Sequence, residues 1–427
     1  GGTFTDVALA RPGGLSTCKV LTTYSQPEQA ILDGIMQAAD AASVPLSAIE
    51  QVIHGTTLVT NALIERRGAR LAFITTEGFR DVIEMRSENR FEQYDLNLTL
   101  PAPLVPRQDR LTLNERMGPG GEVLLPLHAS DVAAMVQQII DGGYEAVAIG
   151  LMHAYANDAH EVQMAEALRA AAPDLSISIS SVISPQMREL PRFNTVIANA
   201  YVQPQVADYL SRLVDRLRAA QVEAPVFMLH SGGGLISVET AAVARTYRFK
   251  TGSGMTVSTP VVEMVEIGAG GGSIASIDAL GRIQVGPKSA ASEPGPACYQ
   301  RGGQEPTVTD SNLVLGRLDP DSFAGGAIPL SAAASEVAIA TRLSVMSGLS
   351  IPDTAFGVTE MVDENMANAA RVHTVENGRD IEHFTMIGFG GGAPLHACRL
   401  CEKLGIDALL IPPGAGVGSA IGFLKAP

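Results

Sequence analysis

The sequence predicts an α/β protein, and two observations lead to this fold class. Short apolar segments alternate with longer amphipathic ones, in the order strand, helix and strand over residues 51–76 and again over 129–180, which is the pattern of α/β units. Several apolar segments also end in glycine-rich turns, where open sheets bind ligands. Because the chain has 427 residues, more than one hydrophobic core is expected.

Composition is typical of an acidic globular protein. The net charge is −15 and 46% of the residues are hydrophobic, which argues against a nucleic-acid partner and against disorder. No apolar run approaches the roughly 20 residues that a membrane helix needs, so no membrane partner is expected. Four cysteines in so long a chain favour a reducing compartment, and we expect a cytoplasmic protein. Cys398 and Cys401 could form a redox or metal pair, but the helical periodicity around them favours thiols on a helix face or in the core.

The first segment, Gly1–Asp6, reads Gly-Gly-Thr-Phe-Thr-Asp and runs into an apolar strand. Its glycines allow the backbone to approach a ligand closely, the Thr3 and Thr5 hydroxyls can donate to phosphate oxygens, and Asp6 is a carboxylate of the kind that holds magnesium. The segment predicts a hairpin whose tip binds phosphate; the alternative is an ordinary turn with a solvated Asp6. No strand precedes Gly1, so we expect the chain to begin part-way into its first element.

The other elements follow from periodicity. Helices are expected at residues 26–41, 58–67, 129–141, 161–171, 193–220, 331–345 and 352–371, and strands at 70–76, 146–152, 176–180, 225–230, 274–278, 385–389 and 408–411. Pro204 should kink or split the helix over 193–220. A helix that opens at Ser237 becomes a strand by Ala244 with no breaker between them, so we expect residues to be absent near 242–243.

Glycine turns at strand ends recur along the chain. They are Gly1–Asp6, Gly232–Gly234, Gly268–Ser273 and Gly388–Pro394. None matches the lysine-containing phosphate loop or the dinucleotide fingerprint. Together they predict a nucleotide held between two domains.

A polar cluster follows the strand that ends at His54. His54, Thr56 and Thr57, with Asn61, lie near one expected helix start, where they could bind an anion or orient a polar substrate. The alternative is a capped helix with a structural histidine.

Other polar residues leave two interpretations open. Asp310 and Asn312 open a helix, either as an N-terminal cap or as polar contacts in a cleft. His153 and His160 could ligate a metal, but their spacing is not a standard ligand pattern, and a solvated loop is favoured. His230 ends a strand and is either ligand-facing or part of the core.

These motifs together resemble the hydantoinase A / 5-oxoprolinase family, over essentially the whole chain. The matching segments are Gly1–Asp6, His54–Ala62, Thr75–Asp81, Glu266–Ala275, Gly286–Tyr299, Thr307–Asp310 and Gly388–Ala397. The resemblance implies an actin-like ATPase fold, in which duplicated ribonuclease-H-like α/β domains bind ATP and Mg²⁺, with an additional α/β subdomain. We expect an N-terminal region with the phosphate hairpin over residues 1–190 and the ATPase domain over 191–427.

The resemblance also suggests site residues. Asp6 is expected to hold Mg²⁺, and Asp6, His54 and Asp310 are the candidates for catalysis. The loop after the strand at 385–389 is expected near the adenosine. The expected ATP-binding residues are Gly1, Gly2, Thr3, Thr5, Thr56, Thr57, Gly270, Gly271, Gly272, Gly388, Gly390, Gly391 and Gly392.

The activity implied by the resemblance is ATP-dependent chemistry on a carbonyl compound. Family members cleave cyclic amides such as hydantoins, 5-oxoproline or lactams, relatives carboxylate ketones with bicarbonate, and bacterial forms pair with a B-type subunit. We expect a hetero-oligomeric hydrolase subunit that phosphorylates the amide oxygen so that water can open the ring. The alternatives are a ketone carboxylase subunit, a sugar-type kinase that shares the fold, and a non-catalytic nucleotide-binding regulatory subunit.

One departure from the family pattern bears on ATP hydrolysis. The family carries a second phosphate motif, of the Asp-x-Gly-Gly-Thr type, in the region that corresponds to Ala242 and Val243, and this motif is absent here. The place is the same one at which the helix-to-strand pattern breaks, so we interpret both as absent residues.

Overall fold

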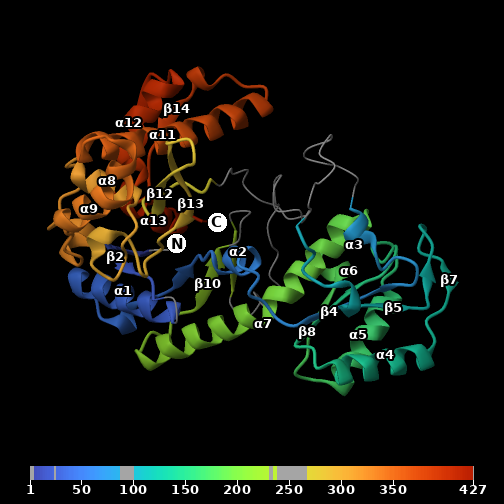
Figure 1. Cartoon of the computed structure of the whole chain (residues 1–427). Coiled ribbons are helices and arrows are strands. Elements are labelled where there is room, and N and C mark those ends of the chain that lie inside the picture. The colour runs from blue at the N-terminus through green and yellow to red at the C-terminus, as the bar shows by residue number, and fades with distance from the viewer. Residues whose placement is uncertain (1–3, 24–25, 87–100, 230–233, 238–266, 427) are drawn as a thin grey trace. The chain divides into compact units, whose positions relative to one another are not determined.

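The computed structural model of the chain describes residues 4–23, 26–86, 101–229, 234–237 and 267–426. These residues form two compact units: the first combines 1–50, 216–224 and 263–426, and the second combines 51–215 and 225–262. In Figure 1 the blue N-terminal hairpin and helix therefore belong to the same unit as the orange and red C-terminal helices. The boundary at residue 190 stays a prediction. Gly1, Gly2, Thr3, Gly232, His230 and the expected break at 242–243 lie outside the described residues.

The second unit is built on a parallel sheet, which confirms the α/β class. Its strands are β4 (Leu71–Thr76), β5 (Arg110–Leu113), β8 (Ala146–Gly150) and β9 (Ser176–Ile179), in the order β5-β4-β8-β9. All three pairings are parallel. Every residue of β4 and β8 is buried, because helices cover both faces of the sheet. This is why the two strands read as continuous runs rather than as an alternation of polar and apolar residues.

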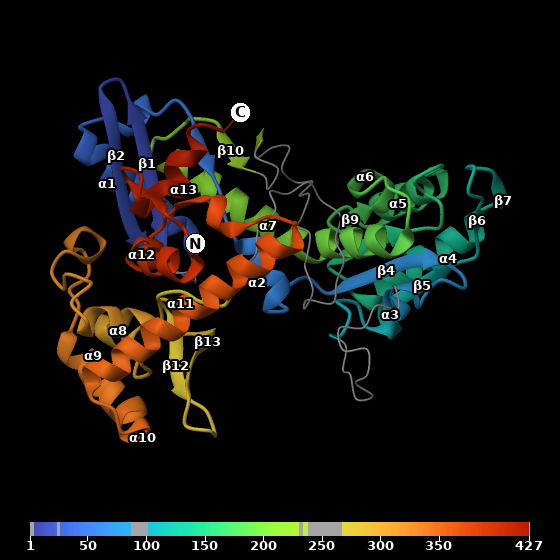
Figure 2. The ribbon, with the colours of Figure 1, turned by 90° about the horizontal axis from the view of Figure 1, so that it is seen from above.

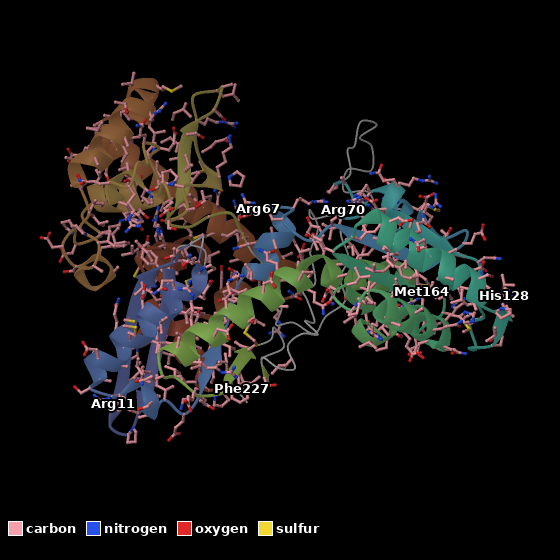
Figure 3. All side chains as sticks on the ribbon, turned by 90° about the horizontal axis from the view of Figure 1, so that it is seen from below. Arg11, Arg67, Arg70, His128, Met164 and Phe227 are labelled. Atoms are coloured by element: carbon pink, nitrogen blue, oxygen red, sulfur yellow. The ribbon has the colours of Figure 1, made fainter. Side chains whose placement is uncertain are left out.

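The two faces of this sheet carry different helices. Ile74 and alternate residues of the neighbouring strands pack on α4 (Ala129–Gly142) and α5 (Ala159–Ala171). Met164 of α5, marked in Figure 3, is completely buried there. Phe73 points to the other face, where its ring lies 5.2 Å from that of Phe193 on α7 (Glu189–Ala219). The period of two along a strand thus produces three layers, helix on sheet on helix.

Pro204 does not split the long helix, although a split was one of the two outcomes expected of it. Helix α7 runs as one element of 31 residues with Pro204 inside it. Buried side chains lie on both sides of the proline, among them Phe193 and Val196 before it and Tyr209 and Leu213 after it. Packing of both halves against the unit outweighs the loss of one backbone hydrogen bond.

The remaining elements of the second unit are short. A three-stranded sheet in the order β11-β10-β3 combines β3 (Val52–His54), β10 (Val226–Leu229) and β11 (Leu235–Ser237), and an antiparallel hairpin combines β6 (Arg116–Met117) and β7 (Val123–Leu125). Short helices are α2 (Leu58–Ile64), α3 (Val82–Met85) and α6 (Ser180–Ile183).

His160 is buried, so the solvated-loop interpretation was wrong for this residue. Its Nδ1 lies 2.7 Å from Glu115 Oε2, and its Nε2 accepts a hydrogen bond of 3.3 Å from the Leu127 amide. The imidazole therefore donates from Nδ1 to the carboxylate, which also accepts from the Thr76 hydroxyl. No group of three or more metal-ligating side chains occurs among the residues that the structure describes. The His160–Glu115 pair joins α5 to the end of the sheet.

The first unit begins with an antiparallel hairpin of β1 (Phe4–Arg11) and β2 (Gly14–Leu21). Helix α1 (Pro27–Ala42) lies along one face of it, as Figure 2 shows. A Cβ on Gly34 would lie 2.6 Å from Val7 Cγ2, so the helix can approach the strand this closely only with glycine there. The Cys18 thiol donates to the Gly34 carbonyl at 3.1 Å. Val7 and Cys18 thus mark the face of the hairpin that is turned to α1.

Helices carry most of the rest of this unit. A hairpin of β12 (Ser273–Ile277) and β13 (Ile283–Ser289) packs with α8 (Val308–Val314) and α11 (Ile351–Glu376). The strands β14 (Thr385–Ile387) and β15 (Ala408–Leu410) are parallel and are joined through α12 (Ala393–Leu404). Further helices are α9 (Ala332–Ile339), α10 (Val345–Ser347) and α13 (Gly418–Phe423), with one π-helical turn over Ala340–Ser344. No helix in the described ranges is long and apolar enough to cross a membrane.

The thiols on α12 lie on the helix face, as the periodicity predicts. Cys398 is exposed and Cys401 is buried, and both are free. Cys401 packs with Ala367 of α11 and with Leu404 and Ile406 in one apolar cluster. Cys401 is therefore part of how α12 packs, whereas Cys398 lies on the exposed side of the helix, and the two form no disulfide.

An ion-pair network joins α11 to α12. The Arg399 guanidinium donates two hydrogen bonds to Glu360, of 2.8 and 2.9 Å, and Lys403 Nζ lies 3.1 Å from both Glu360 and Glu364. The hydrogen bonds from Arg399, followed by those from Lys403, lower the pKa of Glu360 to about 2. A bidentate guanidinium–carboxylate pair is the strongest form of this interaction.

This network predicts a pH-dependent stability difference. The pKa of Glu360 is lower in the folded protein than in the unfolded chain. Its contribution to the free energy of unfolding is therefore complete above about pH 4.5 and is lost as the pH falls toward 2. Urea unfolding should show Glu360→Gln less stable than the wild type by about 1 kcal/mol at pH 6, since the site is partly exposed. The difference should shrink by pH 3. Glu336→Gln, on the exposed face of α9, is the control. A stability difference between Glu360→Gln and the wild type that does not change with pH would contradict the low pKa of Glu360.

Candidate functional site

The face of the first hairpin that is turned away from α1 carries a charged pair. Asp6 and Lys19 are directly opposite each other in the β1–β2 register, and Lys19 Nζ is ion-paired with Asp6 Oδ1. The same ammonium lies 5.2 Å from the centre of the Phe4 ring. Both charged side chains are only partly exposed, at 19% for Lys19 and 27% for Asp6. The partial burial keeps this pair stronger than a fully solvated one.

Thr5 belongs to the other face of the same hairpin. Successive residues of a strand point to opposite sides, so Thr5 shares the side of Val7, which contacts α1. Its hydroxyl lies 3.1 Å from that of Thr22. Asp6 and Thr5, which the sequence groups in one phosphate hairpin, therefore point in opposite directions along the described strand.

A glycine loop joins β14 to α12. The amide of Gly388 donates to the Leu410 carbonyl at 3.0 Å and that of Gly390 to the Ala415 carbonyl at 2.7 Å, which fixes the first half of the loop. Gly390 has a φ of +101°, a conformation that favours glycine. A Cβ on Gly392 would have no atom within 4 Å, so open space adjoins the start of α12.

The charged hairpin face and this glycine loop lie next to each other. A Cβ built on Gly391 would lie 3.6 Å from Lys19 Nζ. Within the described part of the chain, the amides of Gly391 and Gly392 have no hydrogen-bond acceptor. Free amides at the start of a twelve-residue helix, beside an ammonium group, form a favourable place for an anion. The tertiary structure thus brings together two sequence candidates, Asp6 and the loop over 388–392.

The other predicted glycine loop, over 268–272, is held by its own neighbours. The Gly271 carbonyl accepts two hydrogen bonds from Thr309, of 2.8 Å from the amide and 2.9 Å from the hydroxyl. The Gly270 amide donates to the Ser273 hydroxyl at 2.9 Å. A Cβ on Gly272 would lie 2.9 Å from Ser289 Oγ. These glycines therefore form a tight turn immediately before β12, and Thr309 holds this turn against the start of α8.

Asp310 is buried and forms the cap of α8. The Thr307 side chain accepts from the Asp310 amide, and the Asp310 carboxylate accepts from the Thr307 amide at 2.9 Å, which is a capping box. The same carboxylate accepts from the Cys298 amide and the Ser335 hydroxyl, each at 2.8 Å. Of the two interpretations that the sequence left open, the structure shows the cap. Asp310 is fully buried, so its charge is used to position the chain around it.

Asn312 lies two residues further along α8 and reaches a buried histidine. His396 Nε2 lies 3.3 Å from Asn312 Nδ2, and His396 Nδ1 lies 2.6 Å from Asp363 Oδ1 on α11. All three side chains are buried, and the second oxygen of Asp363 has no hydrogen-bond partner. His396 belongs to the first turn of α12, so this junction fixes the helix that follows the loop over 388–392.

His54, Thr56 and Thr57 belong to the second unit. His54 ends β3, and its Nε2 lies 2.7 Å from the Tyr209 hydroxyl on α7. Burial lowers the pKa of His54 to about 4, so the imidazole is neutral near pH 7. Thr56 Oγ1 accepts from the Leu58 amide at 3.1 Å, and Thr57 Oγ1 lies 3.5 Å from Asn61 Nδ2. The hydroxyls therefore contact the first turn of α2.

Sequence reasoning missed Lys19 and His396. A signal for Lys19 was present, because a tight turn at Pro12 and Gly13 sets a register that places residue 19 opposite Asp6. His396 stood inside the glycine motif, but its partners Asp363 and Asn312 are distant in sequence. Only the packing of three helices brings them together.

Comparison with known proteins identifies the family. The profile of the hydantoinase/oxoprolinase family matches residues 192–248 and 241–427, and the profile of the hydantoinase/oxoprolinase N-terminal region matches residues 1–172. These matches cover most of the chain. The chain belongs to the hydantoinase/oxoprolinase family, as its motifs predicted.

Individual relatives show the range of this family. The chain is 31% identical to the caprolactamase subunit alpha of Pseudomonas jessenii, over 99% of this chain and 68% of that one. It is 29% identical to the acetophenone carboxylase gamma subunit of Aromatoleum aromaticum, over 99% and 66%. The chain thus spans about two thirds of the length of these relatives.

Solved structures extend the comparison to the fold. The ATP-dependent caprolactamase of Pseudomonas jessenii matches with a TM-score of 0.80 and 30% identity, over 100% of this chain and 70% of that one. A nucleotide-free acetone carboxylase structure matches with a TM-score of 0.87 and 23% identity, over 100% and 69%. At 23% identity the second likeness concerns the fold alone.

The junction at His396 predicts strong energetic coupling. His396→Leu leaves the Asp363 carboxylate buried without its partner, so the free energy of unfolding should fall by about 3 kcal/mol. The double variant Asp363→Leu/His396→Leu should lose less than the sum of the two single losses, by at least about 1 kcal/mol. Urea unfolding of the four proteins measures this cycle. Additive losses would show that the 2.6 Å contact contributes nothing specific.

Proposed function

We propose that the chain is the nucleotide-binding subunit of an enzyme that opens a cyclic amide with ATP. The observation that carries the proposal is the Lys19 ammonium, paired with Asp6, beside the glycine loop at the start of α12. The cyclic amide comes from the similarity to caprolactamase, at 30–31% identity. Phosphorylation by ATP would convert the amide oxygen into a leaving group.

The residues at this place fit a polyphosphate. The free amides of Gly391 and Gly392 can donate to phosphate oxygens, and Lys19 can neutralise their charge. The open space at Gly392 allows the backbone to approach a ligand. In the proposal, Gly388 and Gly390 hold the loop in shape, while Gly270, Gly271 and Gly272 shape the second turn of the site. Gly1, Gly2, Thr3 and Thr5 stay proposed ligands of the phosphates.

The described residues at this place offer Mg²⁺ one carboxylate ligand, Asp6. Magnesium is commonly held by one or two carboxylates together with substrate phosphates and water, and Asp6 offers one carboxylate. Since Asp6 is already paired with Lys19, the two cations would share it. The nucleotide would supply the remaining ligands.

The other candidates take separate proposed roles. A neutral His54 can accept a proton, and the hydroxyls of Thr56 and Thr57 can contact an anion at the start of α2. Asp310 acts through position: by capping α8 it holds Thr309, which in turn holds Gly271. We also propose an actin-like ATPase fold and a hetero-oligomer with a B-type subunit, because the relatives are named as subunits.

A second function has specific support. The similarity to an acetophenone carboxylase subunit, at 29% identity, favours an ATP-dependent ketone carboxylase almost equally. A regulatory subunit that binds but does not hydrolyse ATP is the third possibility. One assay separates all three.

That assay is phosphate release from ATP and Mg²⁺ by the protein with its B-type partner. Caprolactam, hydantoin, 5-oxoproline, and acetophenone with bicarbonate are the substrates. We expect release that depends on a cyclic amide, with the ring-opened product found by mass spectrometry in equal amount. Release with acetophenone and bicarbonate alone would establish the carboxylase. ATP binding without release under any condition would support the regulatory subunit.

The glycine loop predicts a binding defect without a folding defect. Gly392→Ala meets no neighbouring atom, and alanine at a helix N-cap costs no more than about 1 kcal/mol. Its methyl group would occupy the space proposed for phosphate, so ATP affinity should fall about tenfold or more, as measured by calorimetry. Gly422→Ala, equally free of neighbours in α13, is the matched control. Unchanged affinity in Gly392→Ala would contradict the site, whatever the enzyme's substrate.

A further inference from the structure

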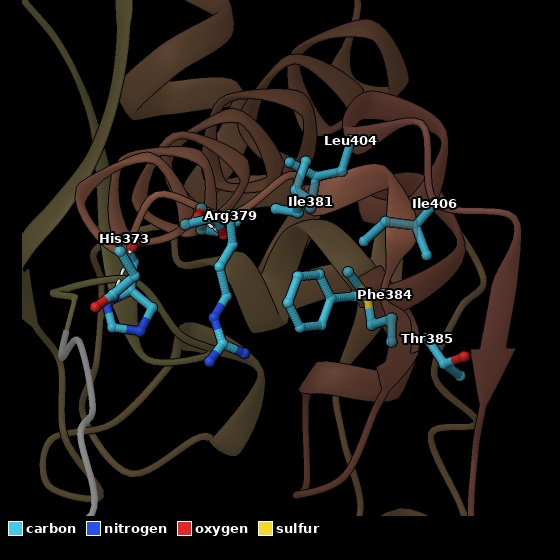
Figure 4. A pocket seen from close by; sticks show the side chains of 11 residues that line it. His373, Arg379, Ile381, Phe384, Thr385, Leu404 and Ile406 are labelled. Carbon is cyan, nitrogen blue, oxygen red and sulfur yellow. Dashed lines mark hydrogen bonds between the residues drawn. The ribbon is translucent and has the colours of Figure 1, made fainter.

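A pocket opens at the opposite end of β14 from the glycine loop. It has a volume of about 450 Å³ and lies among the end of α11, the start of β14 and the end of α12 (Figure 4). Its lining residues are Ala370, His373, Thr374, Asn377, Arg379, Ile381, Phe384, Thr385, Met386, Leu404 and Ile406. Since the loop over 388–392 follows the carboxyl end of β14, the pocket is distinct from the proposed nucleotide site.

The floor of the pocket is apolar. Ile381 and Phe384 come from the segment that enters β14, and Met386 lies in that strand. Leu404 and Ile406 come from the end of α12 and the residues beyond it. Phe384 remains 43% exposed, although an aromatic ring gains free energy by burial. A ligand with an apolar body would cover this ring.

Two nitrogen groups at the edge of the pocket are free to bind a ligand. The buried Nδ1 of His373 has no hydrogen-bond partner. In Figure 4 the Arg379 side chain extends between His373 and Phe384, and among the described residues its guanidinium has neither a hydrogen bond nor an ion pair. Asp380, its neighbour in sequence, lies 3.4 Å from His383 instead.

The other polar side chains of the lining are already used. The Thr374 hydroxyl donates to the Ala370 carbonyl at 2.7 Å, and the Asn377 amide donates to the His373 carbonyl at 2.9 Å. Neither side chain places a negative charge in the pocket, and no carboxylate belongs to the lining. The free donors are therefore cationic or neutral nitrogens in a protein whose net charge is −15.

We propose that this pocket binds a small organic carboxylate with an apolar body of about five or six carbons, in a site separate from the nucleotide. A guanidinium fork matches a planar carboxylate, and the volume lies in the lower part of the range of small-molecule sites. The apolar floor accounts for the body of the ligand and disfavours inorganic phosphate, which has none. The proposal is independent of the reaction that the enzyme catalyses.

The test is titration of the whole chain with hexanoate, without ATP, followed by calorimetry. Hexan-1-ol replaces the carboxylate with a neutral group, and acetate and inorganic phosphate remove the apolar body. We expect saturable binding of one hexanoate, with affinity at least fivefold above that for each of the three controls. Equal affinity for hexan-1-ol would overturn the proposal, as would binding of inorganic phosphate at the strength of hexanoate.

Two matched variants locate the site. Arg379→Gln should weaken hexanoate binding at least fivefold, because the charged hydrogen bonds are lost. Arg301→Gln, another exposed arginine of the same unit, should leave binding unchanged. Both arginines are on the surface, so neither change is expected to unfold the protein, and circular dichroism checks this. Equal binding by Arg379→Gln and wild type, or no saturable binding at all, would overturn the proposal.

Discussion

The buried contact between His396 and Asp363 is the constraint on which the first unit depends. It joins α12 to α11, and through Asn312 it reaches α8. Two of the three helices that it joins lead to glycine loops: α12 follows the loop over 388–392, and α8 holds Gly271 through Thr309. A buried polar junction tolerates little displacement, because a shift would leave a carboxylate unpaired in a medium of low dielectric constant. The two loops are therefore fixed by the same three helices.

The second unit uses the same principle at the end of its parallel sheet. Glu115 accepts from His160 and Thr76, and the buried Glu161 accepts from the Leu151 amide and the Ser180 hydroxyl, while Arg192 lies beside it. Burial raises the pKa of Glu161, and its hydrogen bonds oppose that rise. These groups fix the loops that follow β5 and β8. In both units, apolar packing forms the layers and a few buried charges set the positions of the loops.

Much of the fold and part of the site could be predicted from the sequence. The continuous apolar runs of β4 and β8 and the amphipathic periodicity of α4 and α11 located these elements to within a few residues. The glycine loops were found because their spacing is local. Continuity through Pro204 was not predictable, since it depends on burial of Phe193 and Tyr209 on both sides. The burial of His160 was missed for the same reason: Glu115 is distant in sequence.

By itself the sequence determined the class, the family and the segments that carry chemistry, because periodicity, turn residues and motifs are properties of neighbouring residues. The tertiary structure decided which of these segments meet. It placed Lys19 opposite Asp6 and beside Gly391, turned Thr5 to the other face, and enclosed Asp310 in a cap. Such contacts join residues that are far apart along the chain, and their geometry is set by the packing of helices whose facing residues no local pattern identifies.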